Sequence, residues 1–239
     1  MTLNGNRIVI LGGSSGIGLA VAQAAAAEGA RLVIASSSQV RVDEALSQLP
    51  PGAEGRVLNL ADGSAVEAFF EGAGPFDHLV YTAGESLKLG PLDELDLQAA
   101  RGFFELRYWG AFTAARVARR QIRPGGSIVF TSGLAGARPH AGWSVAASIC
   151  AGMEGLTRAL AVELAPIRVN IVSPAVVRSP LWREMDAGAR DALYAAEAAR
   201  LPVGHVGEPA EVAEAYLYLM RQTYGTGQTL VVDGGASLV

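Results

Sequence analysis

The sequence predicts an α/β fold, in which one domain forms a doubly wound sheet of seven parallel strands with helices on both faces. Short runs rich in β-branched residues alternate with longer Ala-rich amphipathic stretches, which is the pattern of βαβ units. The apolar runs contain few polar residues, as expected for strands buried on both faces. The 239 residues are enough for one large domain with a substantial core, spanning 1–239.

The expected elements follow this alternation in chain order. Runs such as "RIVIL" and "RVNIVS" have the β-branched composition of strands, and we expect strands at 7–11, 31–36, 56–60, 77–82, 127–132, 168–173 and 229–233. The Ala-rich stretches between them predict helices at 16–29, 40–48, 64–72, 96–122, 143–164 and 209–221. Right-handed crossovers between such strands give a Rossmann-type sheet.

Residues 175–207 interrupt the regular alternation, with "SPLWREM" followed by an Ala-rich stretch. This excursion comes after the sixth expected strand. A long segment at the carboxyl end of a strand is a common place for a lid or substrate wall. The segment is therefore either a substrate-side lid or loop, or a helical hairpin that only packs.

Composition excludes several classes of protein. A net charge of -4 and a pI near 5.4 give no electrostatic reason to expect nucleic acid as a partner. The only cysteine, Cys150, excludes an internal disulfide. The amino-terminal residues lack a signal-peptide cleavage site, and no apolar run approaches the roughly 20 residues of a membrane span. We expect a soluble cytoplasmic protein with a small-molecule substrate, no bound metal, and neither nucleic acid nor membrane as a partner.

A glycine-rich turn follows the first expected strand. In "GGSSGIG", Gly12, Gly16 and Gly18 have the spacing G-x-x-x-G-x-G. Glycines here let the backbone turn sharply and approach a pyrophosphate, which then lies at the amino end of the next helix. Because the turn joins a strand to a helix inside a βαβ unit, it predicts a dinucleotide site and not merely a tight turn.

The end of the second expected strand favours NADP(H) over NAD(H). An acidic residue there would bind the ribose 2′-hydroxyl and repel a 2′-phosphate. The sequence reads "ASSSQVR", with no carboxylate before Asp43. Ser36 and Ser37 can donate hydrogen bonds to a phosphate, and Arg41 is close enough in sequence to approach it.

Taken together, the motifs resemble those of the short-chain dehydrogenase/reductase family over almost the whole chain. The matching segments are "GGSSGIG", "LVYTAG", "GSIVFTSGLAG", "GLTRALAVELAPIRVNIVSP" and "GQTLVVDGG". The resemblance implies a nicotinamide cofactor and a homodimer or homotetramer built on paired long helices. With the glycine turn, it predicts these cofactor-binding residues: Gly12, Ser14, Ser15, Gly16, Ile17, Gly18, Ser36, Ser37, Asn59, Leu60, Ala83, Gly84, Pro174 and Val177.

The same resemblance implies four side chains for chemistry, namely Ser, Tyr, Lys and Asn. Alignment on neighbouring motifs places the Ser at Gly133, the Tyr at Ala146, the Lys at Cys150 and the Asn at Arg107. Lys88 is the only lysine in the chain, and the residue four before it is not Tyr, so no Tyr-x-x-x-Lys occurs anywhere. The usual proton-transfer residues are therefore expected to be absent.

Milder departures concern the cofactor contacts. Asn59 replaces the usual Asp near the adenine, and Pro174 is followed by Ala instead of Gly. Ser179 stands where a Thr often bonds the carboxamide, and "YTAG" lacks the two usual Asn residues. The resemblance thus implies that the adenine half of the site is better preserved than the nicotinamide half.

Other residues are available for chemistry near the altered positions. His140, in the loop before the fifth helix, could exchange a proton or could be a solvated loop residue. Cys150 requires nearby positive charge to act as a nucleophile, and otherwise fills the space of the lysine. Arg107 is expected to face the cleft, where it pairs with Glu85 or binds an anion from substrate or cofactor. As a guanidinium it can orient a ligand but does not give up a proton.

Three functions are compatible with these observations. The first is an atypical oxidoreductase that binds NADP(H) and reduces an iminium or a conjugated alkene, because hydride transfer is the cofactor's own chemistry. The second is a catalytically silent protein that binds NADP(H) or serves as an oligomer partner. The third is a non-redox isomerase or lyase that uses the pocket with His140 or Glu85.

Overall fold

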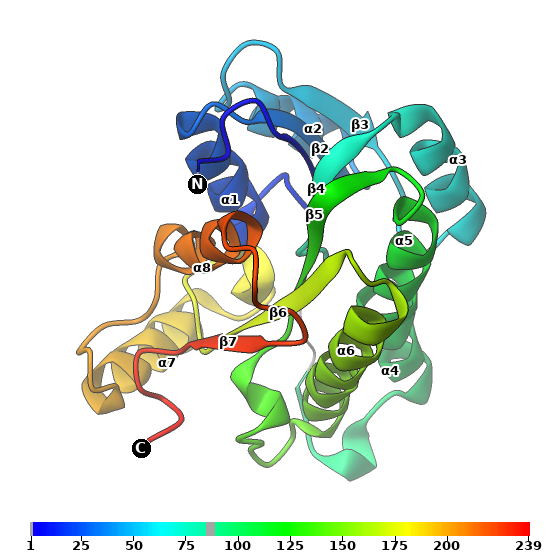
Figure 1. The fold of residues 1–239 in the computed structure, drawn as a ribbon. Helices are drawn as coiled ribbons and strands as arrows, with labels where there is room; N and C mark the ends of the chain where they lie inside the picture. Colours follow the sequence, from blue (N-terminus) through cyan, green and yellow to red (C-terminus); the bar gives the residue numbers. More distant parts are fainter. Residues whose placement is uncertain (1, 85–88) are drawn as a thin grey trace.

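The computed structural model describes residues 2–84 and 89–239 and contains one seven-stranded parallel sheet (Figure 1). The strand order is β3-β2-β1-β4-β5-β6-β7, so the order reverses between β1 and β4. The strands are β1 (Arg7–Leu11), β2 (Arg31–Ser36), β3 (Glu54–Val57), β4 (Phe76–Tyr81), β5 (Ile122–Thr131), β6 (Arg168–Pro174) and β7 (Thr229–Val232). The predicted fold class is confirmed.

The helices connect consecutive strands and lie on both faces of the sheet. They are α1 (Gly16–Ala27), α2 (Gln39–Leu46), α3 (Gly63–Ala73), α4 (Leu97–Phe104), α5 (Gly110–Ala118), α6 (Ser144–Glu163), α7 (Ala187–Arg200) and α8 (Pro209–Arg221). At four helix starts, a side-chain oxygen accepts hydrogen bonds from backbone N–H groups of the first turn. The accepting residues are Ser38, Asp62, Asp96 and Asp186. These polar residues fix where the helices begin.

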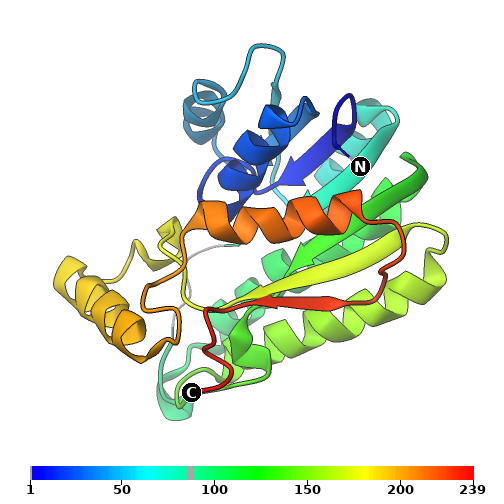
Figure 2. The same ribbon diagram turned by 60° about the vertical axis from the view of Figure 1, so that its left-hand side comes forward.

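Two cores fill the spaces between the sheet and its helices. One core packs α3, α5 and α6 against the sheet, and the other packs α1, α2 and α8 against the opposite face. Figure 2 shows β6 and β7 between α8 and α6. Along β1, Val9 and Leu11 belong to the first core while Ile8 and Ile10 belong to the second. This two-sided burial explains why the strand sequences are continuously apolar.

Several element boundaries differ from the sequence-based expectation. The third strand runs over Glu54–Val57 instead of 56–60, because its ladder with β2 ends where Val57 pairs with Ser36. The fifth strand begins earlier, at Ile122, through an irregular pairing with Phe76. The expected helix at 96–122 is divided into α4 and α5 by one turn of π-helix at Glu105–Trp109.

The excursion at 175–207 contains a short 3-10 helix, Pro180–Trp182, and α7. It has a small core of its own, formed by Val176, Trp182, Tyr194 and Val206. Figure 2 shows α7 beyond the carboxyl end of β6. The excursion therefore packs as a structured unit at the end of the sheet where a ligand would enter.

We expected no apolar segment of about 20 residues, but helix α6 is one. Its 20 residues are long and apolar enough to span a membrane by length and composition alone. The sequence pattern concealed this because polar residues are scattered among the Ala and Leu positions. Ile149, Met153, Leu156 and Leu160 of this helix are buried in the first core, so part of its apolar surface is used in packing.

A buried polar network lies inside the sheet at His78 on β4. The side chain is 3% exposed, its Nδ1 lies 2.9 Å from Ser127 Oγ, and its Nε2 lies 3.0 Å from Asn6 Nδ2. In the neutral ring, Nδ1–H donates to Ser127 while Nε2 accepts from the Asn6 amide. Burial, assisted by the positive charge of Arg168, lowers the pKa of His78 to about 4. The folded protein therefore holds this histidine neutral.

We predict that His78 makes folding stability fall as the pH decreases. A folded-state pKa of about 4 lies below the ordinary value of 6.5, so the unfolded chain binds the proton more tightly. Stability is complete above pH 6.5 and is lost progressively as the pH falls toward 4, by about 3 kcal/mol in all. Urea titrations at pH 7 and pH 5 should show a loss of about 2 kcal/mol that His78→Gln lacks.

His205→Gln is the matched control for this experiment. His205 is exposed, and hydrogen bonding to Glu211 raises its pKa, so its contribution has the opposite sign with pH. The control should retain the loss between pH 7 and pH 5. An equal loss in His78→Gln and in the unmodified protein would contradict the assignment to His78.

Candidate functional site

The main cleft lies at the carboxyl ends of the strands, where the strand order reverses between β1 and β4. Open α/β sheets bind ligands at this point, because the connections on either side lead to opposite faces and leave a crevice. The cleft has a volume of about 410 Å³. All residues predicted for cofactor binding line it, as do Arg107, Gly133, His140, Ala146 and Cys150. The structure therefore brings the sequence-predicted residues into one cavity.

The glycine turn after β1 requires glycine for two distinct reasons. Gly12 and Gly16 have φ values of +90° and +52°, a conformation that side chains disfavour. At Gly18 the constraint is space, since a Cβ would lie 2.3 Å from Gly12 O and 2.4 Å from Thr82 Oγ1. The turn is thus packed against β4 and directs the amino end of α1 at the cleft, an arrangement that fits a pyrophosphate.

The end of β2 presents hydroxyls and a guanidinium to the same cleft. The Arg41 guanidinium donates to Ser37 Oγ at 3.2 Å, and Ser36, Ser37 and Arg41 all line the cavity. Asn59 Oδ1 accepts from the Ala61 backbone N–H at 3.1 Å, which holds its amide beside the cleft. No carboxylate lies on β2 or in the turn that follows it. These groups fit a phosphate better than a bare ribose hydroxyl.

The opposite wall combines Gly133, after β5, with Ala146 and Cys150 one turn apart on α6. A Cβ at Gly133 would lie 3.3 Å from Cys150 Sγ, so the three positions adjoin. Burial raises the pKa of the Cys150 thiol, which disfavours its thiolate. Ser132 Oγ donates to the Cys150 carbonyl at 3.2 Å and lies 3.1 Å from Glu154 Oε1. At Gly133, Ala146 and Cys150 this wall therefore provides a packing surface but no side chain that readily donates a proton.

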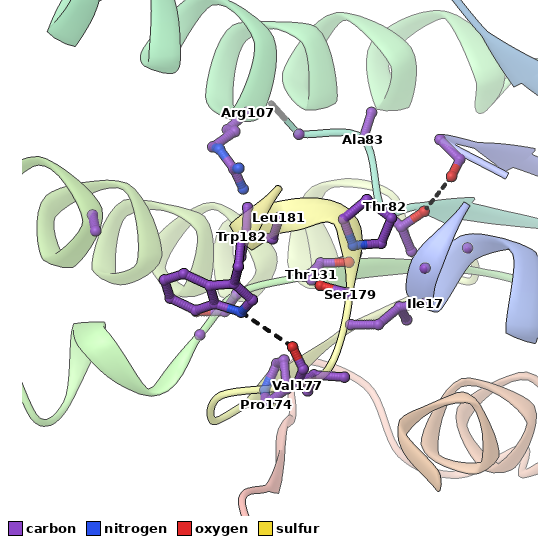
Figure 3. A pocket seen from close by; sticks show the side chains of 18 of the residues that line it. Ile17, Thr82, Ala83, Arg107, Thr131, Pro174, Val177, Ser179, Leu181 and Trp182 are labelled. Carbon is purple, nitrogen blue, oxygen red and sulfur yellow. Dashed lines mark hydrogen bonds between the residues drawn. The ribbon is translucent and has the colours of Figure 1, made fainter. Parts of the chain in front are cut away.

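Arg107 enters the cleft from the π-helical turn between α4 and α5. Figure 3 shows its side chain extending from that helix into the pocket, toward Trp182. A Cβ at Gly84 would lie 2.6 Å from the guanidinium carbon, so the guanidinium packs against the Gly84 backbone. Glu85, the predicted partner, lies outside the described residues. The inward placement of Arg107 itself agrees with the sequence-based expectation.

Two tryptophans, Trp143 and Trp182, also line the cavity. The indole N–H of Trp182 donates to Val177 O at 3.1 Å, which fixes the ring in the wall (Figure 3). His140 is exposed, and its ring makes an edge contact with Trp143, with the centroids 4.8 Å apart. Sequence reasoning did not identify either tryptophan as a site residue. The apolar "PLW" between Arg178 and Arg183 was the available signal for Trp182.

The described part of the chain contains no cluster of metal-ligating side chains. Within residues 2–84 and 89–239, no three His, Cys, Asp or Glu side chains are close enough to hold a metal ion. The polar groups that line the cleft are mainly hydroxyls, backbone amides and guanidinium groups, together with the single side chains of Asn59, His140 and Glu197. That donor set suits phosphates and neutral oxygens better than a cation.

Comparison with known proteins gives a consistent picture of similarity. Residues 12–237 match a family model described as enoyl-(acyl carrier protein) reductase. The short-chain dehydrogenase/reductase ATR9 of Stachybotrys chlorohalonatus is 39% identical, covering 99% of this chain and 99% of that protein. The short-chain dehydrogenase/reductase malC of Malbranchea aurantiaca is 30% identical, covering 99% of this chain and 96% of that protein.

Solved structures show the same similarity in three dimensions. A small-chain dehydrogenase in complex with NADPH superposes with a TM-score of 0.84 at 35% identity, covering 99% of this chain and 100% of that one. The MalC reductase/Diels-Alderase of Malbranchea aurantiaca superposes with a TM-score of 0.89 at 30% identity, covering 97% and 96% respectively. Both similarities extend over the sheet and over the excursion that follows β6.

We predict that Gly18→Ala destabilises the turn that builds this site. The added methyl would meet the backbone oxygen of Gly12, which cannot move without distorting the turn. Thermal unfolding should report a loss of roughly 1–3 kcal/mol. Gly72→Ala in α3 is the matched helical control, since it meets nothing within 4 Å and should stabilise by up to about 1 kcal/mol. Equal responses of the two variants would contradict the packing described here.

Proposed function

The chain belongs to the short-chain dehydrogenase/reductase family, and on that premise we propose that it is an NADP(H)-dependent oxidoreductase for substrates that need no proton from the protein. One observation carries the proposal. The cleft keeps the glycine turn, while Gly133, Ala146 and Cys150 lie together at the positions where the sequence resemblance implies the family's Ser, Tyr and Lys. In this proposal the glycine turn holds the cofactor, and the wall formed by these three residues supplies no proton donor.

Hydride donation is the chemistry that NADPH supplies when it is bound. An iminium ion that accepts a hydride at carbon turns its C=N π pair into the amine lone pair, so no proton is required. A conjugated alkene accepts the hydride at its β-carbon, and the adjacent carbanion then takes a proton from water. An unactivated ketone would instead form an alkoxide, which needs the missing acid. The cleft therefore favours the first two substrate classes.

Arg107 and His140 have proposed roles as substrate-side groups. The Arg107 guanidinium packs beside Gly84 and can hold a substrate oxygen or carboxylate near the reacting bond. His140 lines the cavity from an exposed loop and can exchange protons with solvent. The malC relative carries the name reductase/Diels-Alderase. We extend only the reductase half of that name to this chain.

Association and location form a further part of the proposal. Trp109 and Phe112 are large apolar side chains exposed at the start of α5, and Val162 is exposed on α6. Such groups suit burial against a second copy of the chain. We propose a homodimer or homotetramer that works in the cytoplasm.

We predict that the protein with NADPH reduces N-methyl-3,4-dihydroisoquinolinium or 2-cyclohexenone at least about a hundredfold faster than cyclohexanone, since acid catalysis is worth about that much. Loss of nicotinamide absorbance measures each rate. The triple variant Gly133→Ser, Ala146→Tyr, Cys150→Lys restores three of the four residues that the family resemblance implies and should gain ketone reduction. Brisk ketone reduction by the unmodified protein would overturn the proposal. Binding of NADPH without turnover of any compound would favour a silent binding protein.

We predict that the protein binds NADPH more tightly than NADH and that Arg41 contributes to the difference. Arg41→Gln removes a charge beside Ser37 and should weaken NADPH about tenfold while leaving NADH nearly unchanged. Calorimetric titration with both cofactors measures the two dissociation constants. Arg56→Gln, which removes an exposed guanidinium paired with Glu54 on β3, is the control and should change neither. Tighter binding of NADH by the unmodified protein would be the contrary result.

A further inference from the structure

The π-helical turn at Glu105–Trp109 changes which backbone groups are paired. The Gly110 N–H donates to the carbonyl of Glu105, five residues back, instead of the carbonyl of Leu106, four residues back. This pairing widens the helix by one residue and releases the Leu106 carbonyl from its regular α-helical bond. A buried carbonyl released in this way needs another donor.

Tyr81 supplies that donor from the end of β4. Its hydroxyl donates to Leu106 O at 2.5 Å, and the side chain is only 2% exposed. Space for the hydroxyl depends on Gly110, because a Cβ there would lie 2.5 Å from it. The phenol and the widened turn are therefore fitted to each other, with a glycine at the contact.

Arg107 is the residue that follows this carbonyl in the widened turn. Its guanidinium packs against Gly84, three residues after Tyr81 along the chain. The end of β4 and the turn that follows it thus make two contacts with the π-helical turn. Tyr81 supports the backbone of the π-helical turn at Leu106, and Gly84 packs against the charged side chain of Arg107.

We propose that Tyr81 is a positioning residue, whose hydroxyl holds the widened turn at Leu106 and thereby keeps the Arg107 guanidinium in the cleft. This inference rests on the proposed function only in giving Arg107 a role toward substrate. Without the hydroxyl, Leu106 O is free to take the α-helical bond from Gly110 N–H. The widened turn then moves along the helix, and Arg107 turns away from Gly84.

Cys150 provides a direct report on the position of Arg107. It is the only cysteine in the chain, and its Sγ lies in the cleft beside Gly133. Burial raises the pKa of this thiol, and the positive charge of Arg107 opposes that rise together with a hydrogen bond to Ser132, while Glu154 adds to it. Only the thiolate reacts with iodoacetamide, so the alkylation rate rises as the pKa of Cys150 falls. Moving the Arg107 guanidinium away from Cys150 raises this pKa and slows the reaction.

We predict that Tyr81→Phe slows alkylation of Cys150 at pH 8 by about threefold, equal to about half a pKa unit. Arg107→Gln should slow it by a similar factor, and the double variant should be no slower than Arg107→Gln alone. Tyr108→Phe removes a hydroxyl from the same turn without touching Leu106 O and is the matched control, with no change expected. Mass spectrometry of the intact protein follows the reaction, and a titration in pH gives the pKa.

The outcomes separate positioning from a purely structural role. A lower melting temperature in Tyr81→Phe with an unchanged thiol pKa would mean that the phenol only stabilises the fold, and the inference would be wrong. Additive effects in the double variant would also overturn it. If Tyr81→Phe does not fold, Gly110→Ala, whose methyl group would meet the same hydroxyl and also the Leu60 carbonyl, should give the same change in alkylation. If the thiol responds as predicted but Arg107→Gln leaves substrate reduction intact, the positioning stands and the proposed role of Arg107 fails.

Discussion

The close contact between the turn after β1 and the turn after β4 is the constraint on which the site depends. A Cβ at Gly12 would lie 2.5 Å from the backbone nitrogen of Ala83, and one at Gly18 would lie 2.4 Å from Thr82 Oγ1. Thr82 Oγ1 also donates toward the carbonyls of Leu11 and Gly12, at 3.3 Å each. Because the two turns are packed without side chains between them, the amino end of α1 and the residues after β4 share one cleft.

How much the sequence could predict follows from the range of the interactions involved. The fold depends on continuous apolar runs such as Ile8–Leu11, which are buried on both faces of the sheet. Such a run can be recognised directly in the sequence, because its residues are consecutive. The glycine turn can be recognised in the same way. The π-helical turn is different, because its Leu106 carbonyl accepts a hydrogen bond from the hydroxyl of Tyr81, which lies 25 residues away in the sequence. A contact of that kind leaves no periodic signal, and the uninterrupted helix expected at 96–122 was therefore wrong.

The same reasoning explains the tryptophans that sequence analysis missed. Trp182 is a wall residue because its indole N–H is fixed by the carbonyl of Val177 and because α7 folds back with Tyr194 to bury it. Those contacts arise within the excursion after β6, whose sequence alone was equally compatible with a hairpin that only packs. By contrast, Gly133, Ala146 and Cys150 could be aligned with one another from motifs, since strand and helix registers fix their spacing.

The charged groups of the cleft that are proposed to bind ligands are guanidinium groups, which do not act as acids or bases. Positive charge reaches the cavity on several arginines, among them Arg41 after β2 and Arg107 from the π-helical turn, while Cys150 on α6 is a partly buried thiol whose neutral form is favoured. A guanidinium holds its proton at all physiological pH values, so it binds and orients but does not protonate. In the proposed function Arg107 therefore orients the substrate but does not protonate it. A substrate suited to that role carries its electrophilic carbon in activated form, or accepts its proton from water after the bond to hydrogen has formed.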